Sequence, residues 1–360
     1  MTNNGCIDQL ALLSELVLRD RQSDGFEQIA QAVVDYSHED LARLWDLANS
    51  HHVIMRALPH LRQAFLADEK DEIEWLENAL ATERARIRNA LFFLALVCRL
   101  LNDVGDVIVI KSLDHWPDLG NDLDLYTNAK VADVVAIMRD VFKASIAAPS
   151  LGDRLANKWN FVVPGLPEPV EVHFGRLGQA GEQVAITNSL VARATTAQFG
   201  LHAFRVPAVE ERIMISTLQR MYRHFYLRLC DIANVARLAD SGAIDYEYLR
   251  SLARSAGVWE GLSSYMLIVA EYAERYSGRA LPLPSQVTYA ARVSAANVSL
   301  RREFLRIPLF PQAVALYAKE WASLVFNGEL LNGLRLSLLP GLALAAALAA
   351  KTTGSDKGIW

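Results

Sequence analysis

Cysteine is scarce in this chain. Its 360 residues include three cysteines, Cys6, Cys98 and Cys230, which lie far apart in the sequence. Their odd number and wide spacing exclude a disulfide framework and the paired spacings of common zinc sites. Isolated thiols of this kind are typical of reduced proteins in the cytosol, so we expect a cytoplasmic protein.

A large excess of one charge is also missing. Lysine and arginine number 36 and aspartate and glutamate number 41, so the net charge is −5, and no run of five like charges occurs. Proteins that bind long nucleic acids or acidic membranes usually carry a strongly basic stretch. The composition therefore argues against a long nucleic acid as partner.

Targeting signals are absent or short. The first residues, MTNNGCIDQLALL, lack the basic start and long apolar stretch of a signal peptide, so secretion is not expected. Residues 336–350 carry no charge and lie between Arg335 and Lys351. A membrane-spanning helix needs about 20 apolar residues, and Pro340 interrupts this shorter segment. Its length favours a buried terminal helix over a membrane anchor, which stays open as the alternative.

What is present is a change of hydrophobic period along the chain. Residues 1–100 and 206–330 have helical spacing, and an apolar terminal helix and tail follow at 331–360. Residues 101–205 instead contain the strand-like stretches DVIVIK and DLDLY, and a hairpin pattern around a Pro/Gly turn in KWNFVVPGLPEPVEVHF. The sequence therefore predicts an α+β fold, with a small mixed β-sheet core between an N-terminal and a C-terminal helical region.

Two aspartates share one face of a predicted strand. In VIVIKSLDHWPDLGNDLDLY, residues 107–126, Asp122 and Asp124 are separated by one residue, so their side chains point to the same side of the strand. Two carboxylates this close repel each other unless a cation lies between them. Mg²⁺ prefers a few carboxylates together with substrate phosphates, so we expect a site for Mg²⁺, or for Mn²⁺ in its place.

A third carboxylate lies in the hairpin. Glu171 alternates with Val170 and Val172 in VEVHF, and a strand beside DLDLY would bring it to the same ions. This arrangement, an apolar strand, a small polar turn, an acidic-apolar-acidic strand and then an apolar-acidic-apolar strand, resembles the nucleotidyltransferase superfamily of the DNA polymerase beta type. Closer still is the similarity to a group of uncharacterised nucleotidyltransferases with a lysine in the first motif and a histidine after the third acid. The resemblance covers residues 100–260, including the helical stretch RLCDIANVARLADSGAIDYEYLRSLARSAG.

The resemblance implies a reaction and a role for each acid. Asp122 and Asp124 match the pair that holds the divalent ions, Glu171 matches the acid that shares an ion and helps to deprotonate the acceptor hydroxyl, and Ser112 matches the serine that contacts the β- and γ-phosphates. The implied enzyme moves a nucleoside monophosphate from a nucleoside triphosphate to a hydroxyl of a small molecule, peptide or protein and releases pyrophosphate.

The motif also departs from the superfamily at two positions. Lys111 stands beside Ser112 where glycine is usual, and Glu171 replaces the commoner aspartate. Lysine can supply a point charge to phosphates in place of backbone donors, but its Cβ narrows their approach. These departures keep a second hypothesis open, in which the fold is catalytically degenerate and binds a nucleotide or a partner.

Further polar residues extend the predicted site. His173 has two interpretations: a ligand or hydrogen-bond partner beside Glu171, or a histidine satisfied at the sheet surface. In LQRMYRHFYLRLCDI, Arg220 and Arg223 share one side of a predicted helix and are expected to bind the phosphates. The alternative is a solvated helix face with Arg228 paired to Asp231.

Two more residues, Lys158 and Asp118, lie near the predicted site in the sequence. Lys158, just before the hairpin, is expected to offer charge to a nucleotide, and Asp118 is expected either to approach the metal ions or to be an ordinary loop residue.

Overall fold

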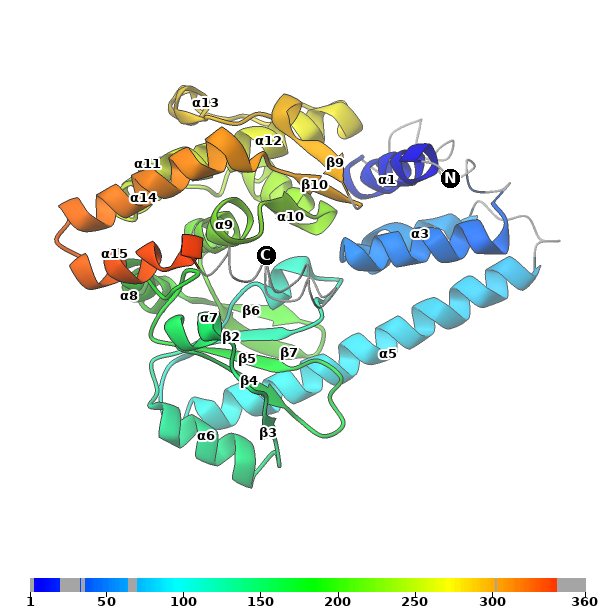
Figure 1. Cartoon of the computed structure of the whole chain (residues 1–360). Helices are drawn as coiled ribbons and strands as arrows, with labels where there is room; N and C mark the ends of the chain where they lie inside the picture. The colour runs from blue at the N-terminus through cyan, green and yellow to red at the C-terminus, as the bar shows by residue number, and fades with distance from the viewer. Residues whose placement is uncertain (1–2, 20–32, 34–35, 64–69, 302, 342–360) are drawn as a thin grey trace.

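A five-stranded mixed sheet lies in the lower half of the molecule in Figure 1, with helices on both sides. This computed structural model describes residues 3–19, 33, 36–63, 70–301 and 303–341. The predicted α+β class is confirmed. Among the described residues, no helix combines the length and the apolarity that crossing a bilayer requires. Most of the apolar segment at 336–350 lies outside the described residues.

The N-terminal region is helical, as its periodicity predicted. Ser37 begins α3 with a capping box, because its side chain accepts a hydrogen bond from the Asp40 amide while the Asp40 carboxylate accepts one from the Ser37 amide. The helices of this region are α1 (Asn3–Leu18), α3 (His38–Ser50), α4 (Ile54–Ala57), the 3₁₀ helix η1 (Leu58–Gln63) and the long α5 (Lys70–Leu101).

The sheet has the order β1-β2-β5-β4-β3. Strand β2 is parallel to β5, and the other neighbours are antiparallel, so the predicted hairpin forms from β4 and β5. The elements of this core are β1 (Val107–Val109), η2 (Ser112–His115), β2 (Leu123–Thr127), α6 (Val131–Asp140), β3 (Ser145–Ile146), α7 (Leu151–Leu155), β4 (Lys158–Val162), β5 (Val170–Phe174) and α8 (Val184–Arg193).

The two faces of the sheet pack against different cores. Leu123 and Leu125 of β2 and Val172 of β5 belong to a cluster with the second half of α5 and with α6. Ile110 and Tyr126 point the other way and pack with the helices of the C-terminal region. Because side chains alternate along a strand, Asp124 and Glu171 lie on this second face, between the sheet and the C-terminal helices.

The C-terminal region is mostly helical, and Gly242 and Gly257 end two of its helices, since both glycines have a left-handed φ just after a helix. Its elements are α9 (Val209–Thr217), the π-helix η3 (Leu218–His224), α10 (Leu229–Asp240), α11 (Tyr246–Ser255), α12 (Trp259–Ser277), α13 (Ser285–Ala290), η4 (Ala295–Asn297), η5 (Leu309–Ala313), α14 (Val314–Phe326) and α15 (Leu330–Ser337).

The prediction of an entirely helical chain after residue 205 is wrong. A small antiparallel sheet forms there from β8 (Tyr226–Leu227), β10 (Phe304–Arg306) and β9 (Ser299–Arg301). A separate hairpin, β6 (Thr195–Phe199) with β7 (His202–Val206), closes the predicted α/β core. Strands of two or three residues have no measurable period, so the helical pattern around them hides them.

Candidate functional site

Three carboxylates, which we call the acidic cluster, lie where β2 and β5 run side by side. Asp124 and Glu171 are direct partners in the parallel register, and both are buried. Asp122 comes one residue before β2. The negative charge of Asp124, followed by burial, raises the pKa of Asp122 to about 6. The sheet therefore brings together the three acids that the sequence singled out.

His173 joins this cluster from the same face of β5. Its Nε2 lies 2.9 Å from Glu171 Oε1 in a hydrogen bond and 3.6 Å from Asp124 Oδ1. One ligand atom from each of Asp124, Glu171 and His173 lies within 4.8 Å of the other two. The other ring nitrogen, Nδ1, is buried and has no hydrogen-bond partner among the described residues. The interpretation of His173 as a partner of Glu171 thus agrees with the observed hydrogen bond.

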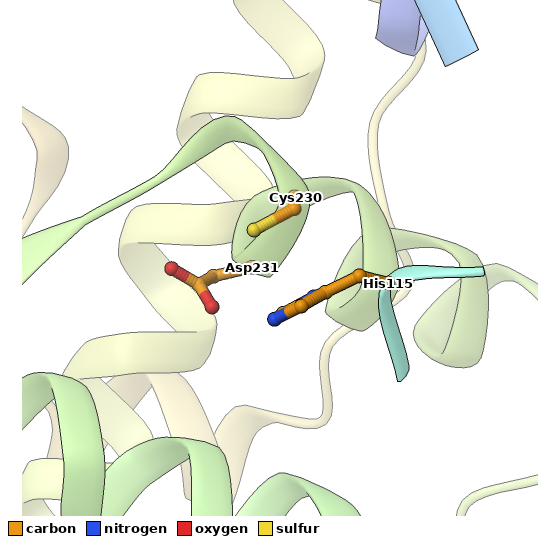
Figure 2. A group of neighbouring side chains, drawn as sticks. All are labelled: His115, Cys230 and Asp231. Atoms are coloured by element: carbon orange, nitrogen blue, oxygen red, sulfur yellow. The ribbon is translucent and has the colours of Figure 1, made fainter. Parts of the chain in front are cut away.

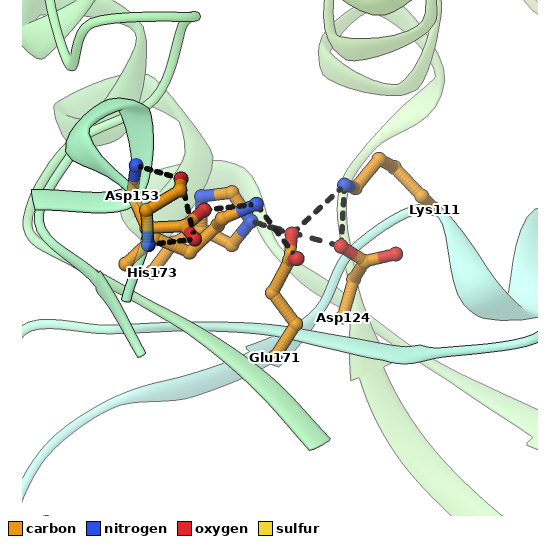
Figure 3. Close-up of polar contacts among 7 residues, drawn as sticks. Lys111, Asp124, Asp153, Glu171 and His173 are labelled. Carbon is orange, nitrogen blue, oxygen red and sulfur yellow. Dashed lines mark hydrogen bonds and ion pairs between the residues drawn. The ribbon is translucent and has the colours of Figure 1, made fainter. Parts of the chain in front are cut away.

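Two lysines balance part of the negative charge (Figure 3). The Lys111 ammonium contacts Asp124 Oδ1 and lies 3.7 Å from Glu171 Oε1, while Lys158 Nζ lies 2.8 Å from Glu171 Oε2 and 2.9 Å from Asp153 Oδ1. Burial would raise the pKa of Glu171, but the hydrogen bond with His173 and the nearby ammonium groups hold it well below its usual value. Lys158 is therefore a partner of the acids, not the free charge for a nucleotide that the sequence suggested.

Two opposing effects act on the pKa of Lys111. Burial lowers its pKa, but the charges of Asp124, Glu171 and Asp122 outweigh burial, so the pKa is raised overall. The lysine is a cation within the acidic cluster, a role that the sequence did not reveal.

Ser112 has a structural task in the same turn. Its hydroxyl accepts a hydrogen bond from the Asp124 amide at 2.7 Å and donates one to the Asp122 carbonyl at 3.2 Å. The hydroxyl thereby ties η2 to the start of β2 and holds the backbone of both aspartates. The predicted contact of Ser112 with phosphates stays a prediction.

The contacts of Asp118 are with residues outside the acidic cluster. Its Oδ1 accepts a hydrogen bond from the Met55 amide at 2.6 Å, and its Oδ2 lies 3.7 Å from Arg56 Nε. Burial raises the pKa of Asp118 to about 7. Of the two interpretations offered above, the ordinary loop residue is the one that agrees with this placement.

Arg220 and Arg223 both lie on the π-helix η3, but Arg228 does not belong to the same helix. The π-helix η3 ends at His224, Phe225 has a left-handed φ of 54°, and the chain then enters β8 before α10 begins. Arg220 is 1% exposed, and its Nε lies 2.7 Å from Asp231 Oδ2. Arg220, instead of the expected Arg228, thus pairs its side chain with Asp231, and the prediction of Arg220 as a phosphate ligand has no support here.

Arg223 lines a small pocket together with Lys111 and His173, which contact the acids of the cluster. This pocket has a volume of about 40 Å³, so it holds little more than water. Its lining combines polar and apolar side chains from the sheet, the 177–179 loop and η3, namely Ile110, Lys111, His173, Leu177, Gly178, Gln179, Ile215, Leu218, Gln219 and Arg223. Gln179 and Gln219 have no sequence signal that would have marked them.

The buried side chain of Glu182 holds the 178–182 loop beside the pocket in place. The buried Glu182 accepts hydrogen bonds from the amides of Gln179 and Ala180, at 3.1 and 2.8 Å. Gly178 has a φ of +95°, and a Cβ there would collide with the Glu182 carboxylate. The 178–182 turn is thus built around this carboxylate, which positions Gln179 at the pocket.

A second group of potential metal ligands, which we call the thiol cluster, consists of His115, Cys230 and Asp231 (Figure 2). The three side chains converge from η2 and the start of α10, and all are buried. Burial raises the pKa of the Cys230 thiol well above its usual range, so the sulfur stays protonated. The Asp231 carboxylate is already bound by Arg220 and by the Arg228 amide.

Positive charges surround the thiol cluster. Arg56 donates a hydrogen bond to Asn234 Oδ1 at 2.6 Å, and the amide nitrogen of Asn234 lies 3.2 Å from His115 Nδ1. Arg228 Nη1 lies 2.7 Å from Nε2 of His52, whose ring stacks on His115. A divalent cation would be repelled here, so the thiol cluster fits a structural role better than a metal site.

A more spacious cavity is separate from both clusters. It has a volume of about 700 Å³ and lies between α5, the Trp116–Pro117 turn and the tip of the β6–β7 hairpin. Its walls are mostly apolar, with Arg84 and Arg88 at one side, and no member of the acidic or thiol cluster lines it.

Comparison of the chain with protein-family models, with curated proteins and with solved structures finds no match. The site must therefore be interpreted from its own geometry.

Proposed function

We propose that the protein is an Mg²⁺-dependent nucleotidyltransferase that moves a nucleoside monophosphate from a nucleoside triphosphate to a hydroxyl of a small molecule, peptide or protein. One observation carries the proposal: Asp124 and Glu171 are paired across parallel strands, and Asp122 lies one residue before β2. Lys111 and His173, which contact these acids, line the same pocket as Arg223. Cytoplasmic localisation belongs to the same proposal, and the cysteines Cys98 and Cys230 are free thiols.

The donor set suits a hard divalent cation. Asp124 Oδ1 is buried and accepts no hydrogen bond from the described residues besides its ion pair with Lys111. The raised pKa of Asp122 reflects negative charge that the two lysines do not fully compensate. Carboxylate oxygens are what Mg²⁺ prefers, and Asp122, Asp124 and Glu171 would hold it. When bound, the ion would neutralise phosphate charge and make the acceptor hydroxyl more acidic.

The side chains of this chain then have defined tasks. The acceptor oxygen forms a bond to the α-phosphorus, the bond from that phosphorus to the bridging oxygen of the β-phosphate breaks, and pyrophosphate leaves. Glu171 would take the proton of the acceptor hydroxyl, and His173 would orient the Glu171 carboxylate through the hydrogen bond at 2.9 Å. Arg223 would bind the phosphate oxygens from the opposite wall of the pocket.

A second candidate is a nucleotide- or partner-binding module without catalysis. Two observations favour it: the Lys111 ammonium already occupies the space between Asp124 and Glu171, and a pocket of about 40 Å³ is too small for a triphosphate unless side chains move. The two candidates differ in whether nucleotide binding depends on a divalent ion.

Incubation with α-labelled nucleoside triphosphates, Mg²⁺ or Mn²⁺ and candidate acceptors tests the proposal. Transfer of label should disappear in Asp122→Ala and persist in Asp106→Asn, whose carboxylate pairs with Arg205 on the surface near β1. Nucleotide binding that survives chelation and Asp124→Asn, with no transfer to any acceptor, would instead support the binding module.

A further inference from the structure

Lys111 has an unusual backbone conformation for a residue with a side chain. Its φ of 62° and ψ of −56° lie in the left-handed region, and the Ser112 amide donates a hydrogen bond to the Ile110 carbonyl at 2.7 Å. These features define a strained γ-turn at the end of β1. Such a conformation is unfavourable for a residue with a Cβ and persists only where the surroundings enforce it. The turn directs a lysine toward the acids, which offset part of that cost.

The ammonium of Lys111 lies where a divalent ion would bind. It contacts Asp124 Oδ1 and is 3.7 Å from Glu171 Oε1. These two carboxylates, with His173, are the residues whose ligand atoms converge to within 4.8 Å. A magnesium ion binds its oxygen ligands at about 2.1 Å. A magnesium ion on Asp124 Oδ1 would therefore lie close to the Lys111 ammonium, and the two positive charges would repel each other strongly.

The same side chain also borders the pocket that Arg223 lines. A lysine has four rotatable bonds, so its ammonium can leave Asp124 and enter this pocket without a change of the main chain. In the pocket, the ammonium would meet the phosphates of a bound triphosphate.

We propose that Lys111 is an internal counter-ion that occupies the divalent-ion position of the acidic cluster in the free protein and exchanges it for triphosphate oxygens when the metal-nucleotide complex binds. This inference rests on the proposed function for the identity of the anion. Because the ammonium and the metal ion compete for Asp124, the metal ion alone binds weakly, and the metal ion and the triphosphate bind cooperatively.

Lys158 provides a matched comparison. It is also buried, and its ammonium lies 2.8 Å from Glu171 Oε2. It contacts Asp153 on its other side and makes no ion pair with Asp124 among the described residues. Replacing Lys158 therefore removes one nearby positive charge without releasing Asp124.

The test measures binding of Mn²⁺ alone by calorimetry to the wild type, Lys111→Met and Lys158→Met. Lys111→Met should bind Mn²⁺ about 5- to 150-fold more tightly than the wild type, the range of a typical coupling between two sites, and Lys158→Met should gain less. Lys111→Gly removes the ammonium as well, and glycine adopts the positive φ without strain. It should bind Mn²⁺ as Lys111→Met does, so a folding defect in one variant does not decide the result.

A second measurement uses Mn²⁺ with a non-hydrolysable triphosphate analogue. Lys111→Met should bind this complex more weakly than the wild type, although it binds the ion alone more tightly. A purely structural lysine would shift both affinities in the same direction. Equal or weaker Mn²⁺ binding by both Lys111 variants, or no Mn²⁺ binding by any of the proteins, would overturn the inference. Opposite shifts without any nucleotide transfer would uphold the counter-ion and reject the enzymatic proposal.

Discussion

The acidic cluster and the thiol cluster have similar geometry and opposite surroundings. In the acidic cluster, Asp124 and Glu171 with His173 place three buried ligand atoms within 4.8 Å of one another, and His115, Cys230 and Asp231 do the same in the thiol cluster. In the acidic cluster, three carboxylates outnumber the ammonium groups of Lys111 and Lys158. In the thiol cluster, the single carboxylate is paired with Arg220, and further arginines lie nearby. We therefore predict that the charge around converging ligands, more than their spacing, decides which of the two clusters can hold a cation.

The strongest test of this contrast removes the carboxylate of the thiol cluster. Asp231→Ala should lower the free energy of unfolding by about 3–5 kcal/mol, because Arg220 would remain buried without a counter-charge. Urea denaturation followed by circular dichroism measures the change. As a control, Glu77→Ala breaks the exposed pair with Arg62 and should cost about 1 kcal/mol or less.

A double variant makes this test more specific. Asp231→Ala combined with Arg220→Met should recover much of the lost stability, since the uncompensated charge is removed together with its partner. If the double variant is as unstable as the single one, then the capping of α10 by Asp231, and not the ion pair, is what stabilises this region.

The next largest effect concerns metal binding. Asp124→Asn should weaken Mn²⁺ binding at least about 100-fold, since loss of a direct ligand should exceed the 10- to 100-fold effect typical of outer-shell partners. Cys230→Ser should leave the affinity unchanged. Electron paramagnetic resonance of free Mn²⁺ in equilibrium with each protein gives both values. Weakened binding in Cys230→Ser alone would reverse the assignment of the two clusters.

The sequence was most informative where a short period repeats. Alternation in DLDLY and VEVHF predicted two strands with their acids on one face, and the observed register pairs Asp124 with Glu171. Hydrophobic spacing likewise predicted the helices of residues 1–100, of which α5 is one. These are local properties, so a single sequence contains enough information to predict them.

The sequence pattern did not predict which side chains pair with partners that are distant in the sequence. Arg220 and Arg223 look alike in the sequence, but one is buried against Asp231 and the other lines the pocket. The left-handed turn at Phe225 breaks the predicted helix between them and Arg228, and no local signal marks it. The strained backbone of Lys111 was equally hidden, because a lysine at positive φ is stabilised by carboxylates that are distant in the sequence.

A pH titration tests Asp118, a buried carboxyl group that belongs to neither cluster. Asp118 has a pKa of about 7 in the folded protein, raised by burial, against about 4 when unfolded. Between these values the folded state binds one more proton, so its stability falls as pH rises. Relative to Asp118→Asn, the wild type should therefore lose about 2 kcal/mol between pH 5 and pH 7. A stability difference that is constant with pH would show that Asp118 is already ionised at pH 5.

The smallest expected effect tests how the acidic cluster is held in place. Ser112→Ala removes the acceptor for the Asp124 amide and leaves that buried amide unpaired, so stability should fall by about 1 kcal/mol. The Mn²⁺ affinity should fall a few-fold as well, because Asp124 and Asp122 are no longer tied to the turn. Ser112→Thr retains the hydroxyl and should restore both quantities. If Ser112→Ala changes stability alone, the hydroxyl supports the fold without orienting the carboxylates, and the contrast with the thiol cluster depends on charge only.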